Sequence, residues 1–259
     1  TIYSEDFTGQ SGKGWSGSSS NFSGVDWTMD VSAATLSSGD YFQIVSSRLE
    51  AQDVDGSVFW FSPQQNIIGY QNVSLSINLS EAGTLESNDY VKVSVSIDGG
   101  AYQNINDLGG TNGSKADDFG STTASVSGLS GSTIQIRIEM KNNAGNEYHR
   151  ADNISLTGTP VQFCQSGTDP TPTITGTTGG TFSSTTGLSI NASSGLIDLS
   201  ASTAGTYTVS YLTSNSLCAV TGTFVVTVLP SESPAFTYAF ATYCESDSDP
   251  TPTVTGTTG

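Results

Sequence analysis

Positive charge and histidine are scarce in this chain of 259 residues, which has seven Lys and Arg against 24 Asp and Glu, and a single histidine. Nucleic-acid backbones are bound by clusters of Lys and Arg, so a net charge of -17 indicates that nucleic acid is not a partner. One histidine, His149, cannot form a multi-histidine zinc site. Glycine-rich phosphate loops and nucleophile elbows are also absent, and the sequence therefore favours binding over catalysis.

Long apolar runs are missing as well, because no stretch approaches the roughly 20 residues that a membrane span requires. We therefore expect no transmembrane segment. Gly, Ser, Thr and Asn are abundant, and charged residues make up only 12% of the chain. This composition is typical of a secreted all-β protein rather than of an intracellular enzyme.

The acidic residues are unevenly distributed along the chain. Residues 1–158 hold 18 acidic and seven basic side chains, whereas residues 159–259 hold six acidic side chains and no basic ones. One interpretation of this acidic surface is solubility through self-repulsion, and the other is a set of divalent cation sites.

The C-terminal stretch repeats an earlier one. Residues 164–179 read CQSGTDPTPTITGTTG and residues 244–259 read CESDSDPTPTVTGTTG, so 12 of 16 aligned positions are identical. A fixed period of this size is the signature of an array of like domains. We interpret residues 231–259 as a linker and the beginning of a further repeat, which predicts that the sequence is the front of a longer chain.

The repeat also accounts for the odd number of cysteines. Cys164 opens the complete repeat, Cys218 lies near its end, and Cys244 opens the next. We predict a Cys164–Cys218 disulfide, which closes a loop of about 55 residues and contributes on the order of 4 kcal/mol. Such a bond requires an oxidising compartment. The alternative is three free, buried thiols.

Alternating apolar residues predict short strands in the region 159–230. The strand candidates are residues 206–213 and 222–229, with shorter ones at 188–191 and 195–200. Several short strands repeated at this period predict an immunoglobulin-like sandwich. The prolines within residues 168–176 predict an edge strand that pairs on one side only.

The region 1–158 has more aromatic residues, more charge and longer loops. Strands are predicted at residues 40–53, 57–63, 72–83, 89–102, 132–144 and 151–158. An Asp-Gly-Gly sequence at residues 98–100 is typical of a tight hairpin. Six or more strands without a helix predict a jelly-roll β-sandwich. The expected fold class is therefore all-β, with a jelly roll followed by an immunoglobulin-like repeat.

Four stretches of the first region carry a resemblance: YSEDFTG, LEAQDVDGSVFWFSP, LSEAGTLESNDYVKVSVSIDGG and NNAGNEYHRADNISLTG. They resemble a jelly-roll module of large extracellular Bacteroidetes proteins, allied to carbohydrate-binding and galactose-binding-like sandwiches. Residues 160–229 resemble the tandem repeats of giant cell-surface adhesins in the same bacteria, including gliding-motility adhesins of the SprB kind. The resemblance implies type IX secretion, display at the cell surface, and outer-membrane secretion or motility machinery as a partner.

The resemblance also implies a structural calcium ion, because such jelly rolls often hold one between the first and last strands. Glu5 and Asp6 in the first predicted strand and Asp152 in the last offer hard oxygen ligands. Asp53 and Asp55 form a second acidic cluster, although no carboxylate stands at the twelfth position that an EF-hand requires. The alternative for this pair is a solvated turn.

Aromatic side chains offer a stacking platform for sugar rings. We expect Trp15, Trp27 and Tyr41 to bind a ligand, with Trp15 the best-exposed candidate because it lies among Gly and Ser residues. Trp60 alternates with two phenylalanines and is expected in the core.

The expected function is non-catalytic binding of an extracellular polysaccharide or surface glycan by a cell-surface adhesin. Two alternatives stay open: a carbohydrate-binding module of a secreted polysaccharide-degrading enzyme, and a purely structural spacer. The sequence EYHRAD at residues 147–152 also suits a polysaccharide lyase that uses Tyr148 or His149. However, alternation along a strand places Tyr148 and Arg150 on one face and His149 on the other.

Overall fold

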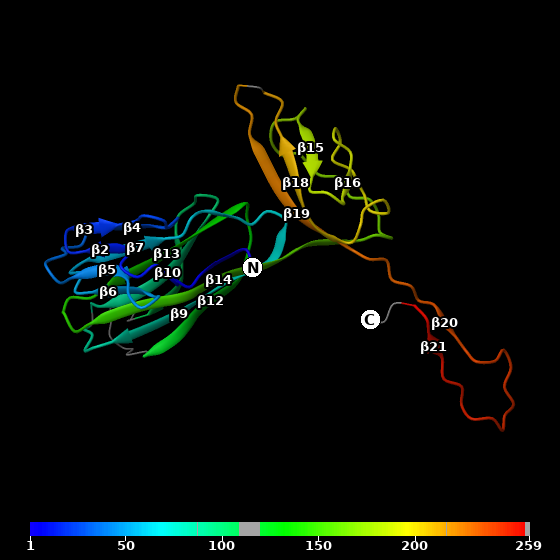
Figure 1. Cartoon of the computed structure of the whole chain (residues 1–259), viewed down its shortest axis with the longest axis horizontal. Helices are drawn as coiled ribbons and strands as arrows, with labels where there is room; N and C mark the ends of the chain where they lie inside the picture. The colour runs from blue at the N-terminus through cyan, green and yellow to red at the C-terminus, as the bar shows by residue number, and fades with distance from the viewer. Residues whose placement is uncertain (87, 109–119, 216, 257–259) are drawn as a thin grey trace. The chain divides into compact units, whose positions relative to one another are not determined.

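The computed structural model describes residues 1–86, 88–108, 120–215 and 217–256, and this part of the chain contains strands but no helix. No helix in these ranges could therefore cross a membrane. The chain divides into two compact units, Thr1–Thr159 and Pro160–Gly259 (Figure 1). The boundaries expected from the sequence, 1–158, 159–230 and 231–259, stay predictions.

The first sheet of the N-terminal unit has the strand order β3-β2-β5-β6-β14-β9-β12, and β1 also pairs with β14. The strands are β1 Tyr3–Glu5, β2 Gly14–Ser16, β3 Ser19–Asn21, β5 Tyr41–Ile44, β6 Leu49–Gln52, β9 Tyr70–Ala82, β12 Ser121–Leu129 and β14 Tyr148–Cys164. Tyr3 lies opposite Leu156, so the first and last strands of this unit are neighbours.

The second sheet has the order β11-β10-β13-β7-β4, with β8 beside β13. Its strands are β4 Thr28–Ala33, β7 Ser57–Phe61, β8 Gln65–Asn66, β10 Tyr90–Ile97, β11 Gln103–Leu108 and β13 Thr133–Lys141. Asp98 and Gly99 join β10 to β11 with φ angles of 53° and 71°. Two consecutive positive φ angles are those of a tight hairpin turn, which confirms the predicted turn.

Alternating residues of both sheets form the core of this unit. In β13, every second side chain from Ile134 to Met140 is buried, as the alternation predicts. Trp60 is 0% exposed and contacts Phe7 and Trp27 at ring-centroid distances of 5.9 and 6.3 Å. The predicted core position of Trp60 and the predicted all-β sandwich fold are therefore confirmed.

The main sheet of the C-terminal unit has the order β15-β18-β19-β14, to which β14 contributes its last residues, and β16-β17 and β20-β21 form two further two-stranded sheets. Its strands are β15 Thr181–Ser184, β16 Ser189–Ile190, β17 Ile197–Asp198, β18 Gly205–Leu212 and β19 Thr221–Leu229. Residues 161–164 of β14 run parallel to β19, with Val161 opposite Val226 and Cys164 opposite Leu229.

The prediction of an edge strand at residues 168–176 is wrong, because this segment forms no strand. The segment is held by single hydrogen bonds instead of a ladder. Ile197 N donates to Pro170 O at 3.1 Å, and Leu199 N donates to Asp169 Oδ1 at 2.9 Å. A proline lacks the N–H that a continuous ladder needs, so isolated contacts replace strand pairing here.

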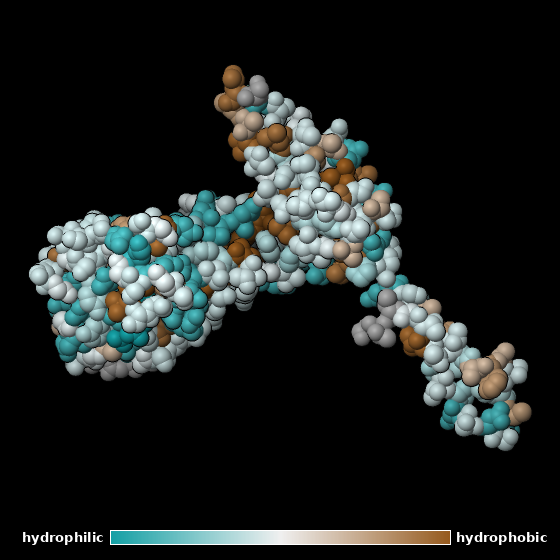
Figure 2. Space-filling model, in the orientation of Figure 1, coloured by the Kyte–Doolittle hydropathy of each residue, from teal (hydrophilic) through white to brown (hydrophobic). Residues whose placement is uncertain are grey.

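Two short strands follow in the same unit, β20 Phe236–Thr237 and β21 Thr253–Val254. Large apolar side chains around them are exposed, including Phe236, Phe240 and Val254. The β18–β19 hairpin exposes apolar side chains too, with Leu217 93% exposed. Figure 2 shows brown apolar residues on the surface of the C-terminal unit, whereas the visible face of the N-terminal unit is mostly hydrophilic.

The predicted Cys164–Cys218 disulfide is contradicted by the structure, in which both residues are free thiols. Cys164 lies opposite Leu229, the last residue of β19, whereas Cys218 precedes Thr221, the first. A strand rises about 3.3 Å per residue, so β19 separates the two cysteines by more than about 20 Å. A disulfide requires Cα atoms within about 7 Å. The repeat period correctly placed both cysteines in the same repeat, but it could not show that they lie near opposite ends of β19.

Candidate functional site

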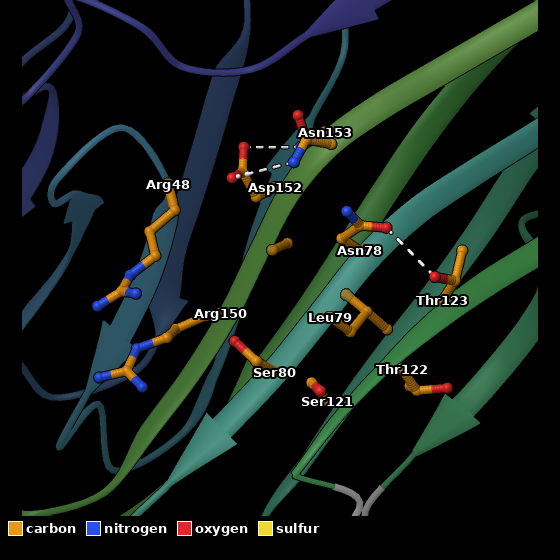
Figure 3. A pocket seen from close by; sticks show the side chains of 11 residues that line it. Arg48, Asn78, Leu79, Ser80, Ser121, Thr122, Thr123, Arg150, Asp152 and Asn153 are labelled. Atoms are coloured by element: carbon orange, nitrogen blue, oxygen red, sulfur yellow. Dashed lines mark hydrogen bonds between the residues drawn. The ribbon is translucent and has the colours of Figure 1, made fainter.

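The outward face of the first sheet contains a hollow of about 490 Å³ over β14, β9 and β12 (Figure 3). It is lined by Arg48, Asn78, Leu79, Ser80, Ser121, Thr122, Thr123, Arg150, Ala151, Asp152 and Asn153. Alternation along β9 turns Ile77 and Leu79 toward the core and brings Asn78 to the exposed face. Hydroxyl, amide and guanidinium groups therefore dominate the lining, and these groups can donate hydrogen bonds to a hydroxylated ligand.

A buried carboxylate fixes the two guanidinium groups at one side of the hollow. Glu50 is 2% exposed, and its Oε2 accepts from Arg150 Nε at 2.5 Å and lies 3.2 Å from Arg48 Nη2. Its Oε1 accepts from the hydroxyl of Tyr41 at 2.6 Å. Burial, followed by the Glu50 carboxylate, raises the pKa of Tyr41, so the hydroxyl keeps its proton. The arginines are thus held in place before any ligand arrives.

Tyr148 and Arg150 lie on one face of β14 and His149 lies on the other, as alternation along a strand predicts. The Arg150 guanidinium lies 4.9 Å from the centre of the Tyr148 ring on the outward face. His149 is 0% exposed on the core side, and both of its ring nitrogens lack a hydrogen-bond partner within the described ranges. Burial lowers the pKa of His149 to about 4. The three side chains therefore do not converge on one reaction centre.

The predicted calcium ligands at the first and last strands lie near one another without converging. Asp152 has its pKa raised, first by burial, and the charge of Asp6 adds to the effect. Glu5 Oε1 instead accepts from Phe7 N at 2.6 Å and Gln10 Nε2 at 3.0 Å. Among the described residues, these carboxylates do not form a group of three whose ligand atoms lie within 4.8 Å.

Asp53 and Asp55 lie in the loop between β6 and β7, with φ angles of 50° and 54°. Burial raises the pKa of Asp53, and the charges of Asp40 and Asp55 add to the increase. The two side chains therefore feel each other's charge. Calcium binding by this pair stays a prediction.

The predicted stacking aromatics are packed into the protein. Trp27 is 2% exposed and its Nε1 donates to Gln10 Oε1 at 2.7 Å, so its assignment as a ligand-binding residue is wrong. Trp15 is half-buried against Phe22, at a ring-centroid distance of 6.3 Å, and its indole nitrogen is buried. Tyr41 is half-buried and reaches the network of Glu50 rather than presenting a free ring face.

Sequence reasoning missed the polar lining of the hollow. Two of the seven basic residues of the chain, Arg48 and Arg150, line it, although they are 102 positions apart. The pairing of β6 with β14 brings them together, with Glu50 opposite Arg150. The scarcity of positive charge was the available signal, because the chain has only seven basic residues and two of them gather here.

Comparison with known proteins finds no matching family model and no matching curated protein. Three solved structures are similar to the chain. TmCBM61 in complex with β-1,4-galactotriose is 12% identical, with coverage of 54% of this chain and 91% of that one and a TM-score of 0.36. The K3 cleaved adhesin domain of Lys-gingipain from Porphyromonas gingivalis is 10% identical, with 60% and 98% coverage and a TM-score of 0.36. The adhesin domain of Epf from Streptococcus pyogenes is 12% identical, with 74% and 81% coverage and a TM-score of 0.29.

Proposed function

We propose that the N-terminal unit is a non-catalytic module that binds an extracellular polysaccharide or surface glycan in the hollow of its first sheet. The observation that carries this proposal is the pair of guanidinium groups, Arg48 and Arg150, fixed by buried Glu50 beside a row of amides and hydroxyls. Sugar hydroxyls need donors and acceptors at fixed positions, and fixed side chains lose little conformational entropy on binding.

The charges of the hollow favour a neutral or weakly anionic glycan. Arg48 and Arg150 are balanced by Glu50 and Asp152, so the formal charges of these four side chains sum to zero. Among the described residues, the lining of the hollow contains no aromatic ring, and nearby Tyr148 is half-buried and lies against Arg150. We therefore expect binding dominated by hydrogen bonds, and affinities in the range of about 10 μM to 1 mM.

Within that proposal, the chain is part of a cell-surface adhesin of the gliding-motility kind, exported by the type IX route. The repeated sequence at residues 164–179 and 244–259 supports it, because tandem domains extend a binding head from a surface. A carbohydrate-binding module of a secreted enzyme is distinguished by a catalytic domain elsewhere in the full-length protein. A structural spacer is distinguished by the absence of any glycan binding.

The test is a glycan array followed by calorimetric titration of the best polysaccharide into the intact chain. Asn78→Ala removes an exposed amide from the hollow, and we expect affinity to fall about five- to tenfold, the value of one or two hydrogen bonds. Arg48→Lys removes the planar fork of donors and should weaken binding by a similar factor.

The matched control is Asn104→Ala, an exposed asparagine on β11 of the second sheet. This variant should bind like the wild type. If Asn78→Ala and Asn104→Ala bind equally well, the ligand does not occupy the hollow. If no polysaccharide binds the wild type, the module is not a glycan-binding one and the spacer alternative stands.

A further inference from the structure

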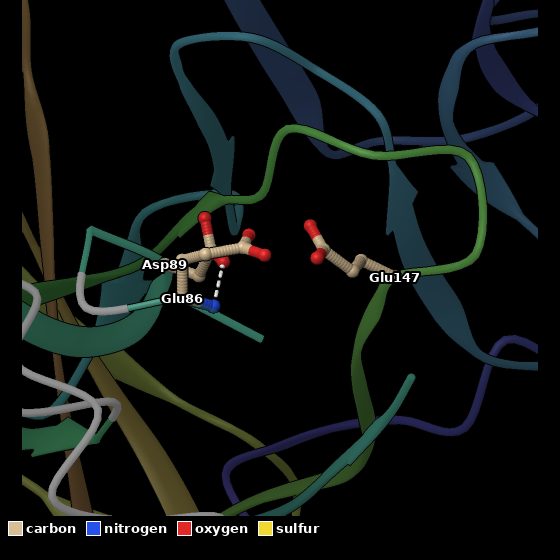
Figure 4. A group of neighbouring side chains, drawn as sticks. All are labelled: Glu86, Asp89 and Glu147. Carbon is tan, nitrogen blue, oxygen red and sulfur yellow. Dashed lines mark hydrogen bonds between the residues drawn. The ribbon is translucent and has the colours of Figure 1, made fainter. Parts of the chain in front are cut away.

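Three acidic side chains outside the hollow lie together in the N-terminal unit. Glu86 and Asp89 belong to the turn between β9 and β10, and Glu147 immediately precedes β14. One ligand oxygen from each carboxylate lies within 4.8 Å of the other two. Figure 4 shows Glu86 and Asp89 on one side and Glu147 on the other, with the carboxylates turned toward the gap between them. Asp89 and Glu147 are each 1% exposed, so two of the three charges are removed from water.

One oxygen of this group has no partner. Asp89 Oδ2 accepts from Glu86 N at 2.5 Å and closes the turn. Asp89 Oδ1 is buried, and among the described residues it has no hydrogen-bond partner. Buried polar atoms are almost always satisfied, so an unsatisfied oxygen on a buried carboxylate of this acidic group points to a ligand of positive charge.

The backbone around the group is fixed independently of any ligand. Asn142 is 0% exposed, and its Nδ2 donates to Glu147 O at 3.2 Å and to Ala51 O at 2.9 Å. Asn143 N donates to Glu147 Oε2 at 3.1 Å, which orients that carboxylate. Gly83 has a φ of 102°, and a Cβ there would lie 2.1 Å from Asn146 O, so only glycine permits the two loops to pack this closely.

The net negative charge of the group is the amount that a divalent cation would neutralise. Three carboxylates carry three negative charges, and Lys141, whose charge acts on Asp89, offsets one of them. Burial is the first cause that raises the pKa of Asp89 to about 6 and that of Glu147 to about 7, and neighbouring acidic side chains add to both.

We propose that Glu86, Asp89 and Glu147 bind one Ca²⁺ ion, which joins the β9–β10 turn to the loop between β13 and β14. Ca²⁺ takes oxygen ligands at about 2.3–2.6 Å, so two of its ligands can lie up to about 5 Å apart. The three oxygens, which lie within 4.8 Å of one another, fall inside that limit. Mg²⁺, with ligands at about 2.0–2.1 Å, allows about 4.2 Å at most. Backbone carbonyls and water complete the roughly six to eight ligands that Ca²⁺ takes.

The experiment is a calorimetric titration of Ca²⁺ into the intact chain after treatment with EGTA, together with thermal melts. Asp89→Asn and Glu147→Gln should each remove one equivalent of bound Ca²⁺. Glu86→Gln, which changes an exposed ligand, should weaken binding about tenfold. Saturation of the wild type should raise the melting temperature of the N-terminal unit by about 5–10 °C at an ion concentration about 100 times Kd.

Loss of Ca²⁺ binding by a variant must be separated from loss of folding. Asp89→Asn keeps an oxygen that can accept from Glu86 N, so this variant should fold. Its EGTA-treated form should melt at or above the wild-type temperature, because one repelling charge is gone.

The matched control is Asp30→Asn, which makes the same charge change at an exposed aspartate in β4, whose Oδ1 accepts from Ser32 N. This variant should bind as many ions as the wild type. The proposal is overturned if the wild type binds no Ca²⁺, or if Asp89→Asn and Glu147→Gln bind as many ions as the wild type. Equal binding of Mg²⁺ and Ca²⁺ at this group overturns the assignment of the ion.

Discussion

The two units of the chain bury very different amounts of apolar surface. Among the described residues, the core of the N-terminal unit contains 25 buried hydrophobic side chains, including two tryptophans, whereas the core of the C-terminal unit contains six. The C-terminal unit adds side-chain hydrogen bonds to its small core, for example at Tyr207. A large core supports buried charges and a shaped surface, whereas a small one leaves room for little beyond the strands themselves.

Trp60→Ala should change the difference in stability between the two units more than any other variant. Removing a fully buried tryptophan should destabilise the N-terminal unit by about 3–5 kcal/mol, because a cavity replaces its ring contacts. Calorimetric scans should show the transition of this unit shifting down while that of the C-terminal unit stays in place. A common shift of both transitions would mean that the units unfold as one.

Acid should destabilise only the N-terminal unit through His149. The pKa of this buried histidine is lowered to about 4, whereas an unfolded histidine titrates near 6.5. Above pH 6.5 the residue is neutral in both states, and its contribution is complete. As the pH falls from 6.5 to 4 only the unfolded state binds the proton, so this contribution decreases by about 3 kcal/mol.

His149→Leu isolates that contribution in chemical denaturation measured between pH 8 and pH 4. The raised pKa values of Asp89 and Glu147 act in the opposite direction, because these groups gain protons first in the folded state as the pH falls from about 7. Both proteins share these groups, so the stability difference between variant and wild type should grow in favour of the variant below pH 6.5. A difference independent of pH would show that His149 is accessible to protons.

Tyr207→Phe should have a smaller effect, confined to the C-terminal unit. The Tyr207 hydroxyl donates to Thr203 O at 2.7 Å and lies 2.6 Å from Thr203 Oγ1. Loss of this hydroxyl should destabilise the unit by about 1 kcal/mol, the usual net value of a hydrogen bond. Urea denaturation followed by circular dichroism measures the change, and Tyr41→Phe in the other unit should leave this transition unmoved.

Reducing agent should have the smallest effect. Because the cysteines are free thiols, dithiothreitol should change the stability of the C-terminal unit by less than about 0.5 kcal/mol. Mass spectrometry after alkylation without reduction should show Cys218 and Cys244 labelled, since both are exposed. Labelling of Cys218 that appears only after reduction would show that the residue is in a disulfide, and the disulfide prediction would then stand.

Alternation predicted most of the long strands, because one buried face imposes a period of two on the sequence. The range 132–144, expected as a strand, contains β13, and the expected range 222–229 covers all of β19 except its first residue, Thr221. The short strands β2 and β3 were missed, since Gly and Ser at these positions carry no apolar signal. The hollow could not be predicted either, because Arg48, Asn78 and Arg150 meet only through strand pairing across the sheet.

The repeated sequence shows why motifs alone do not fix structure. After Cys164, Gly167 N donates to Cys164 O at 2.8 Å, and after Cys244, Asp247 N donates to Cys244 O at 3.0 Å, so the local turn is the same. Cys164 also pairs with β19, whereas Cys244 bonds to Asp247 within its own turn, where Cys244 N also donates to Asp247 Oδ2 at 2.7 Å. Local chemistry determines the turn, and the surrounding strands determine whether the segment joins a sheet.

The parallel pairing of residues 161–164 with β19 has a mechanical consequence. The chain enters the C-terminal unit at Val161 and leaves β19 at Leu229, at opposite ends of the paired segment. Tension along the chain therefore pulls the two strands past each other, and their hydrogen bonds must break together rather than one at a time. Resistance to force then depends on the rate of unfolding under load, not on the modest size of the core. A small domain built in this way can bear load along the chain.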